Sequence, residues 1–355
     1  GKYYFGTTPS QYTSVRLGEF PNPNVGWEKA KKLNLGADLS FFNQLNISVD
    51  YFKENREGIF LQRKSIPMYV GLSTKPWVNI GKMRNSGIDA SLEYHQPLGK
   101  DLHLTVRGNF TYARNRIMDQ DEPDYAYTYM NRSGQMQWQK FGLVAVGLFQ
   151  DQEDIDSWTK QSFGEVKPGD IKYLDLNGDG IVDSYDTKPI GYSDIPEIVY
   201  GFGFSLQWKA FDLSAFFQGV AHVNFSTLTD QTQAFVGRNL KESSVFADLY
   251  GNTWTPENPG AKYPRMTTGA VDNNNQLSTF WMADGRYLRL KNLELGYTLP
   301  KRIANKIAMQ NLRVYLSGVN LFTFSPFKLW DPDLQTGATN YPNNRIINLG
   351  LTIGF

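Results

Sequence analysis

Strict alternation of apolar and polar residues is the feature of this chain that most limits how it can fold. In 33–41 (LNLGADLSF) and 45–51 (LNISVDY) the apolar residues occupy every odd position. This period of two is typical of a β-strand with two different faces, because successive side chains of a strand point to opposite sides of the sheet. Matching the apolar faces across the three-residue connection predicts an antiparallel hairpin with Leu39 opposite Ile47.

A second predicted hairpin has one apolar face and one fully polar face. Matching its alternating runs across a turn at 97–101 places Tyr94 opposite Leu104. The same register places His95 opposite His103 on the polar face. Two histidines make an incomplete metal site, so we favour an ordinary polar surface over metal binding there.

In a third hairpin the apolar residues change from even to odd positions, so the connection must contain an even number of residues. The simplest solution is the two-residue turn Lys209-Ala210, with Trp208 facing Phe211. Nine strands of this kind are predicted in all, at 29–42, 45–57, 85–96, 101–114, 199–208, 211–220, 286–299, 311–322 and 345–355. A short helical turn is predicted at 301–308.

The connections between these strands fall into two classes. The hairpin turns are short, whereas 115–198 and 220–285 are long and show no comparable alternation. Short turns at one end and long loops at the other are typical of outer-membrane barrels. A soluble sandwich would instead bury its apolar face against a second sheet. We therefore predict an all-β fold, an antiparallel transmembrane β-barrel whose long loops are extracellular.

The number of strands indicates that the chain is part of a larger barrel. If the short turns are periplasmic, an odd strand count means that the first strand is entered from outside, and 1–26 is an extracellular loop segment. Bacterial single-chain barrels have an even number of strands, and unpaired strand edges are not tolerated in lipid. We interpret 1–355 as the C-terminal portion of a single β-barrel domain.

Composition excludes several other classes of function. The 36 Lys and Arg residues nearly balance the 35 Asp and Glu residues, which argues against a nucleic-acid binder. The absence of cysteine excludes disulfide scaffolds, thiolate zinc sites and cysteine nucleophiles. We find no Ser-His-Asp arrangement, phosphate-binding loop or paired catalytic carboxylates, and we expect no enzymatic activity.

The segment 175–186 (DLNGDGIVDSYD) has the spacing of an EF-hand-like calcium loop. The ligands expected at positions 1, 3, 5, 7, 9 and 12 are Asp175, Asn177, Asp179, the carbonyl of Ile181, Asp183 through water, and Asp186. Gly180 lies at position 6, where the sharp turn requires glycine. The alternative is a solvated acidic turn, because Asn-Gly and Asp-Gly also form turns. We expect Ca²⁺ here, with the weak affinity of extracellular modules, since Asp replaces the usual Glu at position 12.

Aromatic residues in the long segments allow two interpretations. Stacking on sugars or a peptide is one, and packing of the loops or an interfacial aromatic girdle is the other. We favour the second for the individual residues Tyr125, Tyr127, Tyr129, Trp138, Trp158, Trp254 and Trp281.

Four sequence motifs resemble a known family. They are LGADLSFF (35–42), GDIKYLDLNGDG (169–180), YLRLKNLELGYTLP (287–300) and VYLSGVNLFTF (314–324). In this order they are similar to the C-terminal barrel of SusC/RagA-type TonB-linked outer-membrane transporters, and the resemblance covers essentially the whole chain. It implies a 22-stranded barrel with a plug domain that is absent from this chain. The terminal 349–355, ending in Phe355, also resembles the signal that directs barrel assembly.

The resemblance implies TonB-dependent import of oligosaccharides, or of peptides, across the outer membrane of a Gram-negative bacterium. The implied partners are a SusD-like surface lipoprotein, the TonB complex acting through the missing N-terminal part, the remaining barrel and plug, and outer-membrane lipids. Two alternatives are a calcium-dependent soluble carbohydrate-binding module and a passive porin or adhesin barrel. The module explains the calcium loop and the tryptophans, but not the one-sided distribution of loop lengths.

Overall fold

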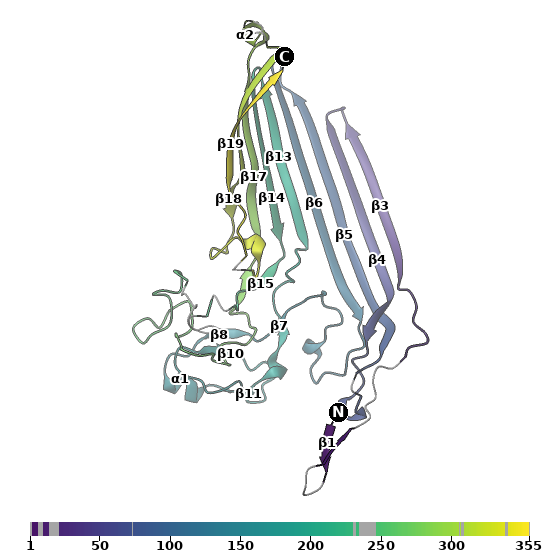
Figure 1. The fold of residues 1–355 in the computed structure, drawn as a ribbon, viewed down its shortest axis with the longest axis vertical. Coiled ribbons are helices and arrows are strands. Elements are labelled where there is room, and N and C mark those ends of the chain that lie inside the picture. Colours follow the sequence, from purple (N-terminus) through teal and green to yellow (C-terminus); the bar gives the residue numbers. More distant parts are fainter. Residues whose placement is uncertain are drawn as a thin grey trace. The chain divides into compact units, whose positions relative to one another are not determined.

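A computed structural model describes residues 2–5, 10–13, 21–72, 74–229, 232–233, 246–304, 306, 309–337 and 340–354. Nine long strands form one antiparallel sheet, in which the spatial order follows the chain (Figure 1). They are β3 (Lys29–Phe41), β4 (Leu45–Gln62), β5 (Trp77–Pro97), β6 (Leu102–Asp119), β13 (Ile198–Trp208), β14 (Phe211–Ala221), β17 (Tyr287–Thr298), β18 (Asn311–Phe324) and β19 (Ile346–Gly354). The predicted all-β sheet of nine strands is confirmed.

Two predicted hairpin registers agree with the structure. Trp208 pairs with Phe211 across the Lys209-Ala210 turn. In the first hairpin, the Ser40 hydroxyl lies 2.7 Å from Asn46 Oδ1, as expected if Leu39 lies opposite Ile47. In both hairpins the requirement to keep the apolar residues on one face selected the correct register.

The predicted register of β5 and β6 is wrong by two residues. The Leu98 amide donates to the Leu102 carbonyl at 2.8 Å, which closes a turn shorter than the predicted one. Gly99 adopts a φ of +82° in this turn, a conformation that glycine reaches without steric cost. His95 Nδ1 consequently lies 3.1 Å from Thr105 Oγ1, and not opposite His103.

Several strands extend beyond their predicted ends. β4 ends at Gln62, and β5 begins at Trp77, eight residues before its predicted start. In the added parts, Phe60 of β4 stacks on Trp77 of β5, with ring centroids 5.4 Å apart. Strict alternation did not predict these extensions, because the added part of β4 has three consecutive apolar residues, Ile59, Phe60 and Leu61.

The two faces of the sheet differ in chemistry. On one face, large apolar side chains are exposed, including Leu349, which is 78% exposed on β19. On the other face, Arg313 Nη2 lies 2.5 Å from both Asp212 Oδ2 and Glu294 Oε1. We call these the outward and the inner face, because an exposed apolar band is what a barrel wall presents to lipid.

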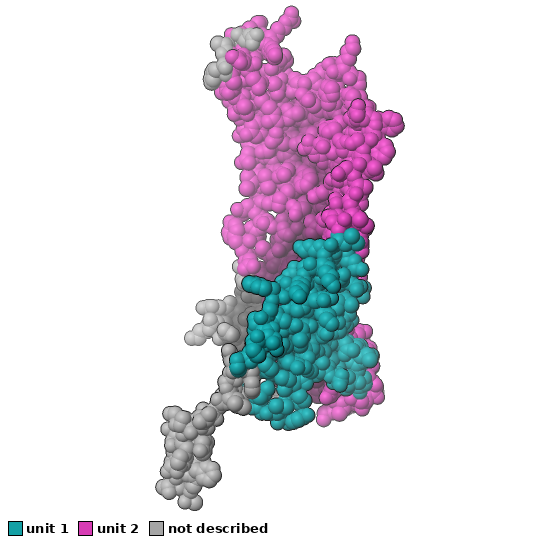
Figure 2. Space-filling model, turned by 90° about the vertical axis from the view of Figure 1, so that its right-hand side faces the viewer, with its two compact units in different colours: residues 1–33, 53–86, 115–137 teal, residues 34–52, 87–114, 138–355 magenta. Residues whose placement is uncertain are grey.

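The chain divides into two compact units (Figure 2). Unit 1 comprises 1–33, 53–86 and 115–137, and unit 2 comprises 34–52, 87–114 and 138–355. Unit 1 contains the short elements β1 (Lys2–Phe5), β2 (Ser10–Thr13), η1 (Met68–Val70) and η2 (Thr128–Met130). The β1–β2 hairpin lies within the predicted loop 1–26.

Unit 2 contains the remaining short elements. They are β7 (Phe141–Gly142), β8 (Ala145–Leu148), α1 (Gln152–Ser157), β9 (Lys160–Gln161), β10 (Ile171–Tyr173), β11 (Ile181–Val182), η3 (Ser184–Asp186), β12 (Lys188–Pro189), β15 (Asn224–Ser226), β16 (Met282–Asp284), α2 (Lys301–Ala304) and η5 (Pro332–Leu334). α2 confirms the first half of the predicted helical turn, whereas Phe355 lies outside the described residues. Among the described helices, none has the length and apolar character required to cross a membrane.

Candidate functional site

Two long connections of unit 2, 138–197 and 246–285, fold together, and we call them the loop module. Its hydrophobic core combines side chains from both segments. The buried members are Leu143, Leu148, Ile171, Tyr173 and Val182 from the first segment, and Trp254 and Trp281 from the second. The two long loops therefore form one folded structure with a shared core.

Hydrogen bonds between the two segments reinforce this core. The Leu143 amide donates to the Leu277 carbonyl at 2.9 Å, and the Thr279 amide donates to the Leu143 carbonyl at the same distance. The buried Tyr173 hydroxyl donates to the Asn273 carbonyl at 2.8 Å. Burial strongly raises the pKa of Tyr173, so this phenol remains a neutral donor at physiological pH.

A buried carboxylate, Asp170, lies at the junction of the two segments and is fully shielded from solvent. Its Oδ1 lies 2.8 Å from Arg265 Nε and accepts a hydrogen bond from the Asn274 amide at 2.9 Å. Its Oδ2 accepts from Arg265 Nη2 at 3.2 Å and from the Lys167 backbone amide at 2.8 Å. This ion pair was not predicted, because Arg265 follows Asp170 by 95 residues and no sequence pattern connects them.

The predicted calcium loop adopts tight turns stabilised by its own side chains. The Asp175 carboxylate accepts hydrogen bonds from the amides of Gly178 and Gly180, at 2.7 and 2.9 Å. These glycines have φ values of +74° and +87°. The Asn177 carbonyl oxygen accepts from the Asp179 amide at 3.0 Å. The turn geometry expected from the motif is therefore present at positions 1 to 6.

Further along the loop, the predicted ligands also bind the backbone. Asp186 is fully buried, and it accepts from the Leu176 amide at 2.7 Å and from the Asp183 amide at 2.7 Å. Asp179 Oδ1 accepts from the Ile181 amide at 2.9 Å. Within the described parts of the chain, no three His, Asp or Glu side chains are grouped closely enough to hold a metal ion. Calcium binding stays a prediction of the sequence.

A cavity of about 540 Å³ lies between the second loop segment and the connection after β18. Its lining includes the aromatic side chains Phe246, Tyr263, Phe280, Trp281 and Phe327. Charged groups complete the lining, among them Asp248 and Lys262, whose carboxylate oxygen and ammonium nitrogen are 2.8 Å apart. Aromatic walls with a few placed charges are typical of ligand-binding cavities.

The charged pair in this cavity is organised by a tyrosine. The Tyr263 hydroxyl donates to Asp248 Oδ2 at 2.6 Å. Hydrogen bonds from Lys262 and Tyr263 lower the pKa of Asp248, while burial and the Asp248 carboxylate raise the pKa of Tyr263. Asp248 is therefore ionised and Tyr263 neutral at physiological pH, so the pair contributes one negative and one positive group to a lining that also includes Asp284 and Lys328.

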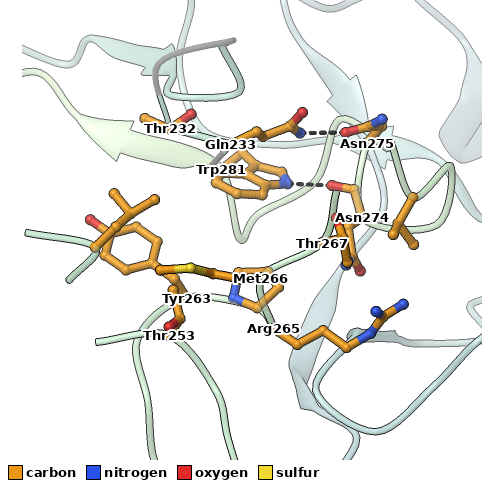
Figure 3. A pocket seen from close by; sticks show the side chains of 13 residues that line it. Thr232, Gln233, Thr253, Tyr263, Arg265, Met266, Thr267, Asn274, Asn275 and Trp281 are labelled. Atoms are coloured by element: carbon orange, nitrogen blue, oxygen red, sulfur yellow. Dashed lines mark hydrogen bonds between the residues drawn. The ribbon is translucent and has the colours of Figure 1, made fainter. Parts of the chain in front are cut away.

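A smaller cavity of about 40 Å³ shares Tyr263 and Trp281 with the larger one (Figure 3). In Figure 3 the Trp281 indole is directed toward Asn274, whose carbonyl accepts from Nε1 at 2.8 Å. Gln233 donates to the Asn275 side chain on the same side. This volume holds a few water molecules at most, so the larger cavity is the candidate ligand site.

A buried glutamate links β6 to the ends of β13 and β14 from which the long connections extend. Glu197, directly before β13, is 4% exposed and accepts two hydrogen bonds from the Arg114 guanidinium, at 2.5 and 2.7 Å. His222, directly after β14, lies 3.1 Å from the second carboxylate oxygen and stacks on Tyr192. Glu197 thus joins β6, through Arg114, to the adjoining ends of β13 and β14.

The aromatic residues of the long loops differ in their environments. Trp254 and Trp281 are buried in the loop module, which confirms the packing interpretation for both. The Trp158 indole donates to the Tyr173 carbonyl at 2.9 Å, and Tyr127 stacks on Tyr129. Trp138 is 61% exposed, and the placement of Tyr125 favours neither interpretation.

The outward apolar face, the charged inner face and the single series of antiparallel strands define the architecture of a membrane barrel wall. The family described as TonB dependent receptor-like, beta-barrel matches residues 2–321. The chain belongs to this family. Its members are outer-membrane proteins of Gram-negative bacteria, and this location applies to the chain.

Two individual TonB-dependent receptors are similar in sequence to the chain. The chain is 30% identical to TonB-dependent receptor P3 of Formosa agariphila, over 97% of the chain and 36% of that protein. It is 26% identical to TonB-dependent receptor SusC of Bacteroides thetaiotaomicron, over 100% of the chain and 34% of SusC. The chain therefore spans about a third of the length of these relatives.

A solved structure supports the fold. The structure of the RagAB peptide transporter matches with a TM-score of 0.69 at 22% identity, over 100% of the chain and 38% of the transporter chain. The resemblance to SusC/RagA-type proteins inferred from four motifs is confirmed by these relationships.

Proposed function

We propose that this chain forms part of the wall and the external loops of a TonB-dependent importer that carries oligosaccharides or peptides across the outer membrane. The observation that carries the proposal is the sheet itself, which has an exposed apolar face and an inner face lined by ion pairs such as Arg313–Asp212. Such a wall separates hydrocarbon from a polar passage.

In this mechanism the loop module provides the binding site for the imported ligand. Its larger cavity offers aromatic rings for stacking, and the pair Asp248–Lys262 for polar contacts. The ligand binds among the loops, and the polar inner face offers it hydrogen bonds along the passage. Energy from the TonB complex, transmitted through a plug domain, opens that passage. A SusD-like lipoprotein covers the loops and retains the ligand.

Two ligand classes are consistent with this cavity. The rings of Phe280 and Phe327 suit the apolar faces of sugars, in agreement with a SusC-type importer. The opposite charges of Asp248 and Lys262 suit the termini or charged side chains of peptides, as in a transporter related to RagAB. We place oligosaccharides first and peptides second.

Uptake assays test this proposal. Cells that produce the complete transporter should accumulate fluorescent oligosaccharides or peptides, and disruption of TonB should abolish the accumulation. TonB-independent uptake would instead identify a passive porin. Replacing both charges, Asp248→Asn with Lys262→Gln, should lower uptake without lowering the amount of folded barrel. Lys167→Gln is a suitable control, because Lys167 pairs with Glu165 at 3.6 Å on the surface.

The calcium prediction belongs to the same proposal. The positive φ values of Gly178 and Gly180, and the hydrogen bonds from their amides to Asp175, support this prediction. We propose that Ca²⁺ binds at 175–186 and stabilises the loop module outside the cell, where millimolar calcium suffices for a weak site.

A further inference from the structure

The outward face of β5, β6 and β13 contains a hollow of about 410 Å³. Gly108 and Ala90 form its floor, where the sheet carries almost no side chain. Leu92, Phe110 and Phe202 stand around it. All five residues contribute only hydrocarbon or backbone, and all lie within unit 2.

Two aromatic rings of β13 leave this space open because they lean toward β14. Phe202 stacks on Phe217, with ring centroids 5.1 Å apart and planes inclined by 16°. Tyr200 lies across Gly219, where an added Cβ would be 2.4 Å from the Tyr200 ring. A Cβ added at Gly108 would meet no atom closer than the Gly201 carbonyl at 3.8 Å. The hollow is therefore accessible from the outward side.

The floor of the hollow is chemically suited to hydrocarbon. Gly108 pairs with Phe202 and Phe110 pairs with Tyr200 in the regular ladder between β6 and β13. The backbone groups below the hollow are thus occupied by partners within the sheet. A surface of this kind, placed on the lipid-facing side of a barrel, attracts acyl chains and not water.

Two lysines lie in the turns at one end of the same strands. The β13–β14 turn contains Lys209, and its backbone amide donates to the Asp101 carbonyl at 2.9 Å, which holds it next to the β5–β6 turn. Lys100 lies in that second turn and is exposed, as is Lys209. The Lys209 ammonium lies over the Trp208 ring, 5.8 Å from its centroid. Both ammonium groups are available to a phosphate.

The distance between these two features matches one lipid leaflet. Leu102 pairs with Trp208 beside the turns, and Gly108 follows Leu102 by six residues. At about 3.3 Å per residue and a tilt of about 40°, this corresponds to a depth of roughly 15 Å. Half of a hydrocarbon core of about 30 Å has the same thickness. A phosphate at Lys209 therefore places the end of an acyl chain above Gly108.

We propose that the hollow above Gly108 binds an acyl chain of one outer-membrane phospholipid, whose phosphate is held by Lys209 and Lys100. The site is distinct from the passage for imported ligands. The inference rests on the outer-membrane location of the family and not on the import of any substrate, so the two proposals can fail separately.

Native mass spectrometry of the complete barrel, titrated with dioleoyl phosphatidylglycerol, tests the site. Gly108→Phe fills the hollow and should weaken retention of the first phospholipid about ten-fold, because about two methylene groups lose their burial. Ala90→Leu should act in the same direction. Lys209→Gln should weaken retention about three-fold, since an exposed charge contact contributes little. Leu316→Phe is the control, because Leu316 is 50% exposed on the outward face of β18.

Heat-dependent migration on gels identifies the variants that are folded. Folded Gly108→Phe and Ala90→Leu barrels that retain phospholipid like the wild type would overturn the proposal. An unchanged affinity in Lys209→Gln would overturn the placement of the headgroup. If the bound species lost on filling the hollow has the mass of lipid A or of an acylated protein, the assignment to a phospholipid is wrong.

Discussion

The buried carboxylate of Asp170 allows a quantitative test of how the loop module is held together. In Asp170→Ala, the buried Asn274 amide and the Lys167 backbone amide lose their acceptor, and Arg265 loses its counter-charge. The Arg265 side chain is 23% exposed, so water replaces part of the lost interaction. Each unpaired amide costs about 1 kcal/mol, and the arginine adds about another 1 kcal/mol.

We therefore expect Asp170→Ala to destabilise the loop module by about 3 kcal/mol, while the strands of the sheet keep their stability. Amide hydrogen exchange measures this locally, since β10 pairs with β8 in the module through Ile171 and Leu148. A loss of about 3 kcal/mol corresponds to roughly 100-fold faster exchange of these amides when they exchange through local opening.

Asp272→Ala provides the matched control. Asp272 lies in the same segment as Asn274 but is exposed, and it should change exchange by no more than about two-fold. An increase of less than about five-fold in Asp170→Ala would refute the reasoning, because it would mean that the buried ion pair contributes little to the association of the two segments.

Three further predictions concern other parts of the chain. Millimolar Ca²⁺, but not Mg²⁺, should slow amide exchange in 175–186, and Asp175→Ala should abolish the effect; a loop indifferent to calcium would contradict the site. Partial burial opposes ionisation of Asp121, but hydrogen bonds from Arg63, Ser65 and the Lys64 backbone lower its pKa from 3.8 to about 2. The stabilisation, at most about 2 kcal/mol, is complete above pH 4 and is lost as the pH falls toward 2, so protease cleavage after residue 63 should increase over this range in the wild type but not in Asp121→Asn. On the inner face, an added Cβ at Gly296 would lie 2.4 Å from Asp212 Oδ1, so Gly296→Ala should cost about 1 kcal/mol of barrel stability in urea, whereas Gly108→Ala, which meets open space, should cost less.

The sequence determined the strands well but determined their pairing only in part. Alternation fixes which face each residue occupies, and a shift by two residues preserves that face. The turn must then select the register. Lys209-Ala210 left one simple solution, and the prediction was correct, whereas Gly99 allowed a tighter turn between β5 and β6 than the one expected.

The candidate site was less accessible to sequence reasoning. The calcium-like motif predicted the turn chemistry of Asp175, but spacing does not tell whether the Asp186 carboxylate faces an ion or the backbone. The larger cavity depends on Asp248 and Lys262, which lie in a segment without periodicity. Only the packing of the loop module brings such side chains together, and a single sequence carries no local signal for it.

The common core of the loop module has a consequence for the engineering and divergence of proteins of this family. Tyr173 from the first connection packs in the same cluster as Trp254 and Trp281 from the second, so a change in one segment alters the fit of the other. Transplanting a single loop between two relatives would leave mismatched halves. A ligand preference should therefore be transferable between relatives only when both segments are exchanged together. Substitutions accepted in one segment should be accompanied by substitutions in the other.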